Sequence, residues 1–348
     1  HLTGHVGGVG SVAVAELDGR PHAITARTDV EVRVGDLTTG EQPRHLVGHA
    51  GVVWSVAVAE LNGRPHALTG STAGEVRVWD LTTGEQSRHL TGHAGDVWSA
   101  AVAELNGRPH ALTVDWDGSV RVWDLTTGEQ TRHLTGHTGP ARSVAVAELN
   151  GRPHALTAYA DRSVRVWDLT TGEQTYHLTG HIFGIVSVAG VELDGRPHAL
   201  TVGRDGSVRV WDLTTGEQTR HLTGHTGPAR SVAVAVAELN GRPHALITGN
   251  GGVVRVWDLT AGEQTRHLTG HIGPVRSVVE LDGRPHALTD SGDGVVRVWD
   301  LITGACLTAY HLPAATSAVA VTVDGTVVLG VGHDVVVLSL APLIRRLP

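Results

Sequence analysis

The chain lacks methionine and lysine altogether and contains a single cysteine, Cys306. One cysteine excludes an intramolecular disulfide, so a cytoplasmic location is the simpler expectation. All 27 basic residues are arginine, and 35 acidic residues outnumber them, so the chain lacks the basic excess that favours non-specific binding to nucleic acids or anionic membranes. No apolar run approaches the roughly 18 residues of a membrane span, and no signal peptide is visible.

The absence of methionine also bears on where the chain begins. Because a chain that starts at His1 does not carry a native N-terminus, we expect it to be a segment of a longer protein. The exclusive use of arginine, with abundant alanine, glycine, valine and proline, is typical of GC-rich bacterial genomes. We therefore expect a bacterial source.

What the chain does contain is a repeat of about 44 residues. Each copy carries a Gly-His pair and, about 30 residues later, a Trp-Asp pair, which the first copy replaces with Gly35-Asp36. A unit of about 40 to 45 residues with these two signatures is typical of a four-stranded propeller blade. The Gly-His pairs begin at Gly4, Gly48, Gly92, Gly136, Gly180, Gly224 and Gly270, and the Trp-Asp pairs at Trp79, Trp123, Trp167, Trp211, Trp257 and Trp299.

The second copy illustrates the expected strands. Its residues 53–60 alternate apolar with polar or small side chains, and residues 64–70, 75–81 and 86–90 are three further candidate strands. Between the first two, Asn62-Gly63 can supply the two positive φ angles of a type I′ hairpin. An Asn-Gly or Asp-Gly pair occupies this place in all seven copies, which supports the assignment throughout.

An eighth, degenerate unit follows, with candidate strands at 318–323, 326–331 and 334–340 around Asp324-Gly325. Its outermost strand would come from residues 343–347 or from His1-Leu2. We predict an all-β fold, a closed β-propeller of four-stranded antiparallel blades, as a single domain over residues 1–348. Eight blades are favoured, with seven WD-type repeats in 1–312 and a degenerate closing blade in 313–348. Seven blades is the alternative, with one unit displaced, unclosed or paired with another chain.

These motifs resemble the WD40-repeat family, strongly up to about residue 312 and weakly beyond it. The resemblance implies a hydrogen-bonded tetrad in each blade, made by the His of Gly-His, a Ser or Thr of the second strand, an Asp of the next turn and the Trp. Carried over by position, the complete tetrads are His93, Thr113, Asp117 and Trp123 in blade 3; His137, Thr157, Asp161 and Trp167 in blade 4; His181, Thr201, Asp205 and Trp211 in blade 5; and His271, Thr289, Asp293 and Trp299 in blade 7.

Three blades depart from the tetrad pattern. Blades 2 and 6 have Ala73 and Gly251 at the Asp position, and blade 1 has Gly35 at the Trp position. Since a buried group that loses its hydrogen-bond partner costs free energy, we expect the histidines of these blades to be less well satisfied.

The repetition argues against catalysis and metal binding. Histidines four residues apart, such as His89 and His93, recur in later blades, but a zinc site needs three or four converging ligands, and we expect no metal. The Asp of each Trp-Asp pair also recurs, whereas catalysis needs one distinct acid–base arrangement, so we expect no enzyme activity. No phosphate loop or nucleophile motif occurs, and no cofactor is expected. The third-strand arginines, such as Arg77 and Arg121, are interpreted as packing and charge-pairing residues.

The copies differ mainly on one rim of the expected propeller. The rim with the Asn-Gly hairpins is almost invariant, whereas two positions of the opposite rim, which in WD40 proteins commonly face the entrance of the central channel, vary between blades. Three tryptophans outside the motif fall at these positions, and Trp and Arg dominate binding hot spots. The predicted partner-binding residues are Trp54, Trp98, Trp116, Asp96, Arg142, Arg204, Arg230 and Arg276. The alternative is that Trp54 and Trp98 merely fill the mouth of the channel.

These features predict a non-catalytic protein-interaction scaffold or sensor module within a larger bacterial signalling or defence protein. The expected partner is a protein or peptide with acidic and aromatic anchors, and not a nucleic acid or a membrane. The alternative is a lectin-like or small-ligand-binding propeller with repeated pockets between its blades. Such pockets would need repeated exposed aromatic residues, whereas the extra tryptophans cluster in blades 2 and 3.

Overall fold

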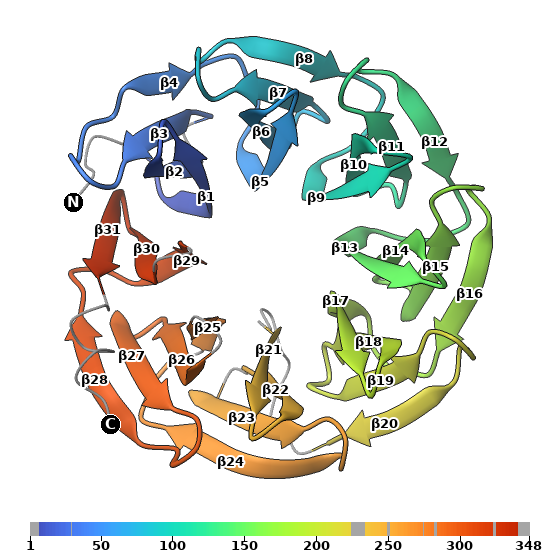
Figure 1. Ribbon diagram of the computed structural model, residues 1–348, viewed down its shortest axis with the longest axis vertical. Helices are drawn as coiled ribbons and strands as arrows, with labels where there is room; N and C mark the ends of the chain where they lie inside the picture. The colour runs from blue at the N-terminus through green and yellow to red at the C-terminus, as the bar shows by residue number, and fades with distance from the viewer. Residues whose placement is uncertain are drawn as a thin grey trace.

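The protein is described by a computed structural model, which covers residues 7–28, 30–223, 234–248, 251–273, 275–281, 284–322 and 325–339. In these residues the chain forms strands and no helix, and the strands make eight antiparallel sheets. Figure 1 shows the sheets as blades that follow one another around a central axis. The prediction of an all-β propeller with eight blades is confirmed, and the seven-bladed alternative is wrong.

In each of the first seven blades the first strand lies nearest the central axis, and the following strands lie progressively further out. Blades 1 to 4 consist of β1 (Val9–Leu17), β2 (Arg20–Arg27), β3 (Val32–Asp36) and β4 (Arg44–Leu46); β5 (Val53–Leu61), β6 (Arg64–Ser71), β7 (Val76–Asp80) and β8 (Gln86–Leu90); β9 (Val97–Leu105), β10 (Arg108–Asp115), β11 (Val120–Asp124) and β12 (Gln130–Leu134); and β13 (Ala141–Leu149), β14 (Arg152–Tyr159), β15 (Ser163–Asp168) and β16 (Gln174–Thr179).

Blades 5 to 7 consist of β17 (Ile185–Leu193), β18 (Arg196–Gly203), β19 (Val208–Asp212) and β20 (Gln218–Leu222); β21 (Val234–Leu239), β22 (Arg242–Ile247), β23 (Val253–Asp258) and β24 (Glu263–Thr269); and β25 (Val275–Leu281), β26 (Arg284–Ser291), β27 (Val295–Asp300) and β28 (Cys306–His311). Within the described residues, blade 8 has three strands, β29 (Thr316–Val321), β30 (Thr326–Val331) and β31 (Asp334–Ser339). Both segments proposed for its fourth strand lie outside the described residues.

The Asn-Gly pairs form the tight turns expected of them. In blade 2, Leu61 pairs with Arg64, and the two residues between them have positive φ angles, 52° at Asn62 and 70° at Gly63. Two consecutive positive φ angles define the type I′ turn, whose twist matches that of the strands it joins. The same pair of positive φ angles occurs in blades 1 to 6, where the turn fixes the register of the two inner strands.

The motif tryptophans pack between blades. Trp123 of β11 is buried in a cluster with Leu68, Val76 and Val78 of blade 2, and Trp79 lies in a similar cluster with residues of blade 1. Aromatic side chains bury roughly 150–250 Å² each and dominate the energetics of such cores. Each Trp therefore joins its own blade to the preceding one.

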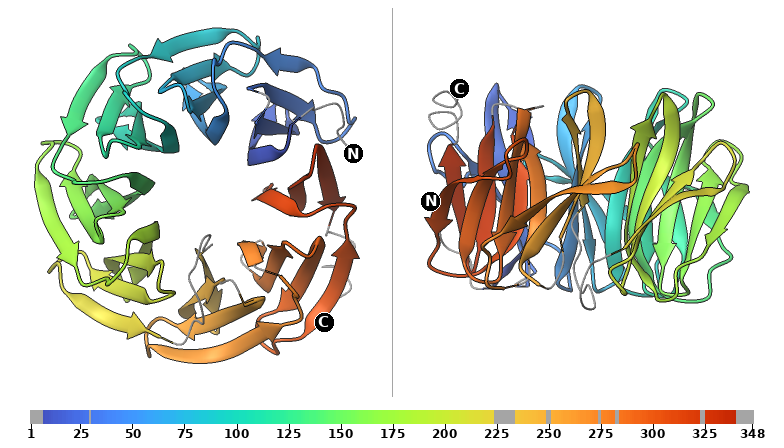
Figure 2. Two further views of the ribbon diagram at one scale, coloured as in Figure 1. Left: turned by 180° about the vertical axis from the view of Figure 1, so that it is seen from behind. Right: turned by 90° about the horizontal axis from the view of Figure 1, so that it is seen from below.

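The ring closes between blade 8 and blade 1. The N–H of Val9 donates to the carbonyl of Gly332 at 3.1 Å, and Val9 packs with Val328 and Val335 in a buried cluster. A Cβ on Gly330 would lie 2.7 Å from a methyl carbon of Val9, so only glycine allows this approach. Figure 2 shows the closed ring from behind and from the side.

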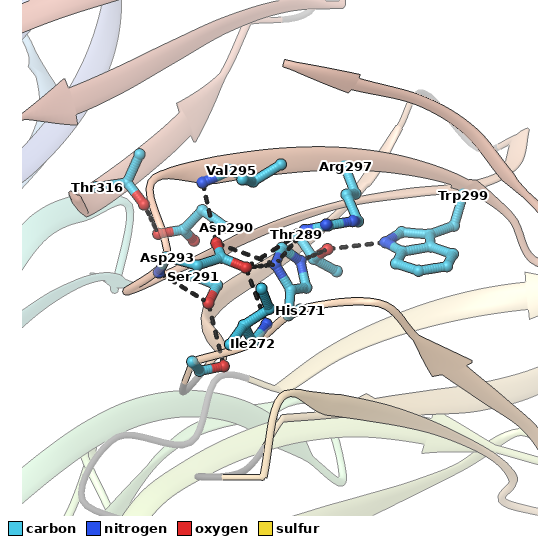
Figure 3. Close-up of polar contacts among 11 residues, drawn as sticks. His271, Ile272, Thr289, Asp290, Ser291, Asp293, Val295, Arg297, Trp299 and Thr316 are labelled. Atoms are coloured by element: carbon cyan, nitrogen blue, oxygen red, sulfur yellow. Dashed lines mark hydrogen bonds and ion pairs between the residues drawn. The ribbon is translucent and has the colours of Figure 1, made fainter. Parts of the chain in front are cut away.

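The boundary between blades 7 and 8 contains a buried polar pair. The hydroxyl of Thr316 donates to the carboxylate of Asp290, and both residues are fully buried (Figure 3). Apolar side chains occupy the corresponding places between blades 1 and 2, where Ala26 and Val53 share a core cluster. The contact between blades 7 and 8 is therefore chemically different from that between blades 1 and 2.

A second set of contacts joins neighbouring blades at the outside of the ring. Nη2 of Arg88 in β8 donates to the carbonyl of Thr126 in the next blade at 2.6 Å, and Arg132 repeats this with Thr170 at 2.7 Å. The side chain of Arg88 fits because residue 128 is glycine, where a Cβ would lie 2.9 Å from Arg88 Cδ. We call these contacts the outer latches; Arg44, Arg220, Arg266 and, through its hydroxyl, Tyr176 form the others.

Candidate functional site

The turns of the propeller gather on two opposite rims, seen edge-on in the right-hand view of Figure 2; the names lower rim and upper rim do not refer to the orientation of that view. The lower rim carries the Asn-Gly hairpins and the turns between the third and fourth strands of each blade. The upper rim carries the loops that enter each blade after Gly-His and the turns between its second and third strands. The sequence varies mainly on the upper rim, which is therefore the candidate site.

A β-bulge at the start of the innermost strand places one residue on the upper rim in every blade except blade 6, where this segment lies outside the described residues. In blade 2, Val53 pairs with Ser71 and Ser55 pairs with Gly70, so Trp54 has no partner of its own in the ladder. Bulges re-aim side chains away from the sheet, and they occur often beside functional sites. The other bulged residues are Gly10, Trp98, Arg142, Val186, Arg276 and Ser317.

Three tryptophans form a ladder on this rim. The rings of Trp54 and Trp98 lie parallel, with centroids 5.7 Å apart and an angle of 11° between their planes. Trp116, from the turn between β10 and β11, also contacts Trp98, with ring centroids 5.8 Å apart and an angle of 35° between the planes. Its backbone N–H donates to the carbonyl of Asp96 at 3.0 Å, so Asp96 positions Trp116 through its main chain.

Much of the ladder faces solvent. Trp54 is 39% exposed and Trp116 is 51% exposed, and both contact Trp98, so the three form one exposed aromatic cluster of the kind that marks interaction sites. Nε1 of Trp98 is buried and has no hydrogen-bond acceptor among the described residues. Trp98 thus supports the two outer rings, while Trp54 and Trp116 offer accessible surface.

Of the four arginines predicted to bind the partner, the structure describes the side chains of two. Arg142 lies at the bulge of blade 4, and Arg204 lies exposed in the turn between β18 and β19 of blade 5. Burial lowers the pKa of Arg142, and the neighbouring positive charge of Arg204 lowers it further. Arg230 lies outside the described residues, and only the backbone of Arg276 is described.

Four further exposed apolar residues on the same rim were not predicted from the sequence. Val47, Ile182, Phe183 and Ile272 are all exposed and lie in the loops that enter blades 2, 5 and 7. With Trp54 and Trp116 they make six of the seven large hydrophobic residues exposed in the described chain, and only Ile302 lies on the lower rim. The available signal was the replacement of small residues after Gly-His by Ile182-Phe183 in blade 5.

The tetrad of blade 7 lies beneath this rim (Figure 3). Nε1 of Trp299 donates to Oγ1 of Thr289 at 2.8 Å, and this hydroxyl lies 2.8 Å from Nε2 of His271. On the other side of the ring, Asp293 lies 3.3 Å from Nδ1 and also accepts from the N–H of Ile272. Burial, followed by the charge of Arg297, lowers the pKa of His271 below its ordinary value. The network therefore fixes the loop that enters the blade.

Blade 4 has the same contacts, with a longer distance between its histidine and its threonine. His137 lies 3.2 Å from Asp161 and 3.4 Å from the hydroxyl of Thr157, which accepts from Trp167 at 2.9 Å. In blade 5 the predicted direct contact between Asp205 and His181 is replaced by a bridge. The hydroxyl of Ser207 donates to Asp205 at 2.7 Å and lies 3.2 Å from His181, whose other nitrogen meets Thr201, the acceptor of Trp211.

Blade 3 corrects the carried-over tetrad. His93 contacts Thr113 at 2.7 Å, and Thr113 accepts from Trp123, but the carboxylate at 2.8 Å from His93 belongs to Asp115 and not to Asp117. Asp115 is the last residue of β10 and is fully buried beside the histidine, whereas blades 4, 5 and 7 have Tyr, Gly and Ser there. Asp117 instead accepts the N–H of Ser119, and the adjacent Asp115 raises its pKa.

In blade 2 the histidine is less well satisfied, as expected, because Nδ1 of His49 is buried without a hydrogen-bond partner among the described residues, although a carboxylate lies beside it. Glu75, two positions after Ala73, places its carboxylate 3.3 Å from Nδ1 of His49 and accepts from the N–H of Ala50. This contact lacks hydrogen-bond geometry at Nδ1, and burial lowers the pKa of His49 to about 4, so the ring is neutral at neutral pH and the contact is not an ion pair.

Blades 1 and 6 are described only in part, because His5 and His225 lie outside the described residues. In blade 6, Ile247 pairs with Arg255 as Thr113 pairs with Arg121, so an isoleucine replaces the tetrad hydroxyl. The sequence interpretation overlooked this substitution, although the alignment of the repeats contains it.

The aspartates of the Trp-Asp pairs cap turns of the lower rim. Asp36 accepts the N–H groups of Thr38 and Thr39 at 2.7 and 3.0 Å, and Asp80 does the same with Thr82 and Thr83. Burial opposes ionisation of Asp36, but these N–H groups outweigh it and lower its pKa to about 2. A carboxylate held ionised by backbone amides is a poor proton donor at neutral pH, which favours a structural role.

The lower rim also contains repeated pockets between blades. One of about 390 Å³ between blades 2 and 3 is lined by Asn62, Arg64, His66, Asp80 and Arg88, among others. One of about 450 Å³ between blades 6 and 7 is lined by the equivalent residues Asn240, Arg242, His244, Asp258 and Arg266. Neither pocket includes an aromatic residue other than histidine.

Two further findings concern the described residues. No group of three or more His, Cys, Asp or Glu side chains is arranged to hold a metal ion there. No helix in that part of the chain is long and apolar enough to cross a membrane.

Comparisons with known proteins give the family. The WD40 family, described as WD domain, G-beta repeat, matches residues 40–80, 84–124, 128–168, 172–212, 216–258 and 262–300. No curated protein matches the chain. Among solved structures, the computationally designed Ika8 protein is similar in fold, with a TM-score of 0.81, 23% identity and 97% of each chain covered. The chain belongs to the WD40 family, whose propellers are commonly scaffolds for protein interaction and generally not enzymes.

Proposed function

We propose that the chain is a non-catalytic interaction module whose upper rim binds a protein or peptide partner. The tryptophan ladder carries this proposal, because Trp54 and Trp116 expose aromatic surface that Trp98 holds in place. Trp and Arg are the residues most enriched among binding hot spots, and both lie on this rim. The gathering of Val47, Ile182, Phe183 and Ile272 on the same rim adds support. The setting in a larger bacterial signalling or defence protein is part of the same proposal.

The test compares partner recovery by three versions of the chain. Trp54→Ala/Trp116→Ala should reduce recovery of a specific partner from the source organism, because loss of one hot-spot tryptophan typically weakens binding about thirtyfold. Ile302→Ala removes the exposed apolar residue of the lower rim and serves as the matched control. If the tryptophan variant keeps its partner while the control loses it, the binding face is the lower rim.

The repeated lower pockets favour a second candidate, a propeller that binds several copies of a small polar ligand. Such a ligand would contact Arg64 and Asn62 in blade 2 and their equivalents in the other blades. A glycan array distinguishes the two functions. Binding that Arg64→Ala weakens and Trp54→Ala/Trp116→Ala leaves unchanged would support the second candidate.

A further inference from the structure

Three arginines of the upper rim differ from the other arginines whose side chains the structure describes. Arginines of the lower rim pair with aspartates, as Arg64 does with Asp80, and those of the outer latches donate to backbone carbonyls. For Arg142, Arg162 and Arg204, no acidic side chain or other acceptor contacts the guanidinium group in the described part of the chain. Nε of Arg142 is buried without an acceptor, although buried N–H groups usually have one.

These arginines belong to adjoining segments of blades 4 and 5. The carbonyl of Gly184 accepts the N–H of Arg204 at 2.9 Å, and a Cβ on Gly184 would lie 3.1 Å from Ala160. The entry loop of blade 5 therefore lies against the turns of both blades. This loop carries Ile182 and Phe183, whose side chains are 67% and 56% exposed. Positive charge and apolar surface are thus combined in one region.

The backbone of Arg162 is strained. It has a φ of +74°, a conformation that L-residues with a side chain rarely adopt, and its equivalents in blades 2, 3, 5, 6 and 7 are glycines, Gly74, Gly118, Gly206, Gly252 and Gly294. An exposed arginine at a position suited to glycine makes no contact that offsets the strain within the described residues. Strain of this kind is concentrated at functional sites.

We propose that Arg142, Arg162 and Arg204 form a subsite for a carboxylate of the partner, bordered by Phe183. The charge of Arg204 lowers the pKa of Arg142, and within the described residues no acidic side chain contacts either guanidinium group. An oxyanion bound between the two groups would relieve this repulsion. The planar donor pattern of arginine matches both oxygens of a carboxylate, and partial burial strengthens that bond. A second acidic group would pair with Arg162. The inference rests on the proposed partner-binding function and adds the chemistry of the anchor.

The experiment uses a phage-displayed library of random dodecapeptides, selected on the immobilised chain. Peptides from the parent chain should be enriched in Asp or Glu, or should end in a free carboxylate. The tightest peptide is resynthesised in three forms, with its acids intact, with each acid changed to its amide, and with an amidated C-terminus. The last two forms distinguish a side-chain carboxylate from a terminal one.

Affinities are measured for the parent, for Arg142→Gln/Arg204→Gln and for Arg20→Gln/Arg64→Gln. The last variant makes the same charge change on the lower rim, where both arginines are about 60% exposed, and serves as the control. Arg142→Gln/Arg204→Gln should bind the acidic peptide at least tenfold more weakly than the parent does. This variant should bind the amide form of the peptide almost as well as the acidic form. The slope of log affinity against log salt should also become shallower.

Equal losses in the two arginine variants would overturn the subsite, as would an undiminished preference for acid in the upper-rim variant. Trp54→Ala/Trp116→Ala separates this failure from failure of the proposed function. If that variant loses the peptide while the arginine variants do not, the rim binds a partner but the carboxylate subsite is wrong. If the library yields no peptide, or the tryptophan variant binds unchanged, both proposals fail.

Discussion

The carboxylate of Glu75 lies 3.3 Å from Nδ1 of His49, the separation that also joins Asp293 to His271 in blade 7. Glu75 accepts the N–H of Ala50 as Asp293 accepts that of Ile272. Ala73 stands at the tetrad Asp position of blade 2. Glu75, two residues later, has a longer side chain that reaches back and puts a carboxylate where the aspartate would be. Blade 2 therefore keeps a carboxylate beside its histidine.

Glu75→Ala is expected to lower the free energy of unfolding by about 1–3 kcal/mol, because it removes the only carboxylate in contact with a buried ring among the described neighbours of His49. Glu85 of the same blade has an exposed side chain, and Glu85→Ala should change stability by no more than about 0.5 kcal/mol. Chemical denaturation followed by tryptophan fluorescence compares the two. Equal midpoints would show that Glu75 contributes nothing to the tetrad.

Stability is expected to fall as the pH falls from about 6.5 towards 4. Burial is the main cause that lowers the pKa of His49 and of His181 to about 4, whereas an unfolded histidine titrates near 6.5. In this range the unfolded state binds more protons, so acidification favours unfolding by up to about 1.4 kcal/mol per pH unit for each histidine.

His181→Gln tests this sign. The variant should be less stable at pH 7, but its free energy of unfolding should depend less steeply on pH between 6.5 and 4.5. Denaturant titrations at several pH values measure the slope. A slope identical to that of the parent would mean that His181 titrates alike in the folded and unfolded states.

Asp115→Ala should destabilise the protein more than Asp117→Ala. Asp115 is fully buried and contacts His93 at 2.8 Å, so its removal leaves a buried partner unsatisfied and should cost about 1–3 kcal/mol. Asp117 is partly exposed and accepts a turn N–H that Asp115 also accepts, so its loss should cost less. Thermal and urea unfolding of both variants provides the comparison, and the opposite order would restore Asp117 to the tetrad.

The polar pair between blades 7 and 8 should show strong coupling. Thr316→Val removes a hydrogen bond from the fully buried Asp290 and should cost about 3 kcal/mol or more. Asp290→Ala/Thr316→Val recreates the Ala26–Val53 pair of blades 1 and 2 and should recover most of that loss. A double-mutant cycle measures the coupling. Simple additivity of the two changes would show that the pair does not act as a unit.

The ring could be predicted from the sequence because its signals recur at a fixed spacing. One Asn-Gly turn is a weak indication, but seven such turns at the same place between Gly-His and Trp-Asp leave few other folds. The eighth blade lacks those motifs, but its succession of candidate strands around Asp324-Gly325 was sufficient to predict it.

The tetrads were harder to predict because hydrogen bonds depend on distances that a repeat pattern does not contain. Position in the motif favoured Asp117, whereas the carboxylate closest to His93 belongs to Asp115. The bridge through Ser207 and the reach of Glu75 depend likewise on side-chain length and local backbone direction. The sequence was sufficient to place Trp54 and Trp98 on the rim, but it did not show that their rings stack.

The outer latches have a consequence for how such a protein can diversify. Each latch connects a blade only to the next one, and the latches and caps lie on the side of the ring away from Trp54 and Arg142. In a repeat architecture stability is largely a sum of contacts between neighbours. A substitution at a bulged rim position therefore leaves the latches intact, and the chain can sample new specificities without first acquiring compensating mutations.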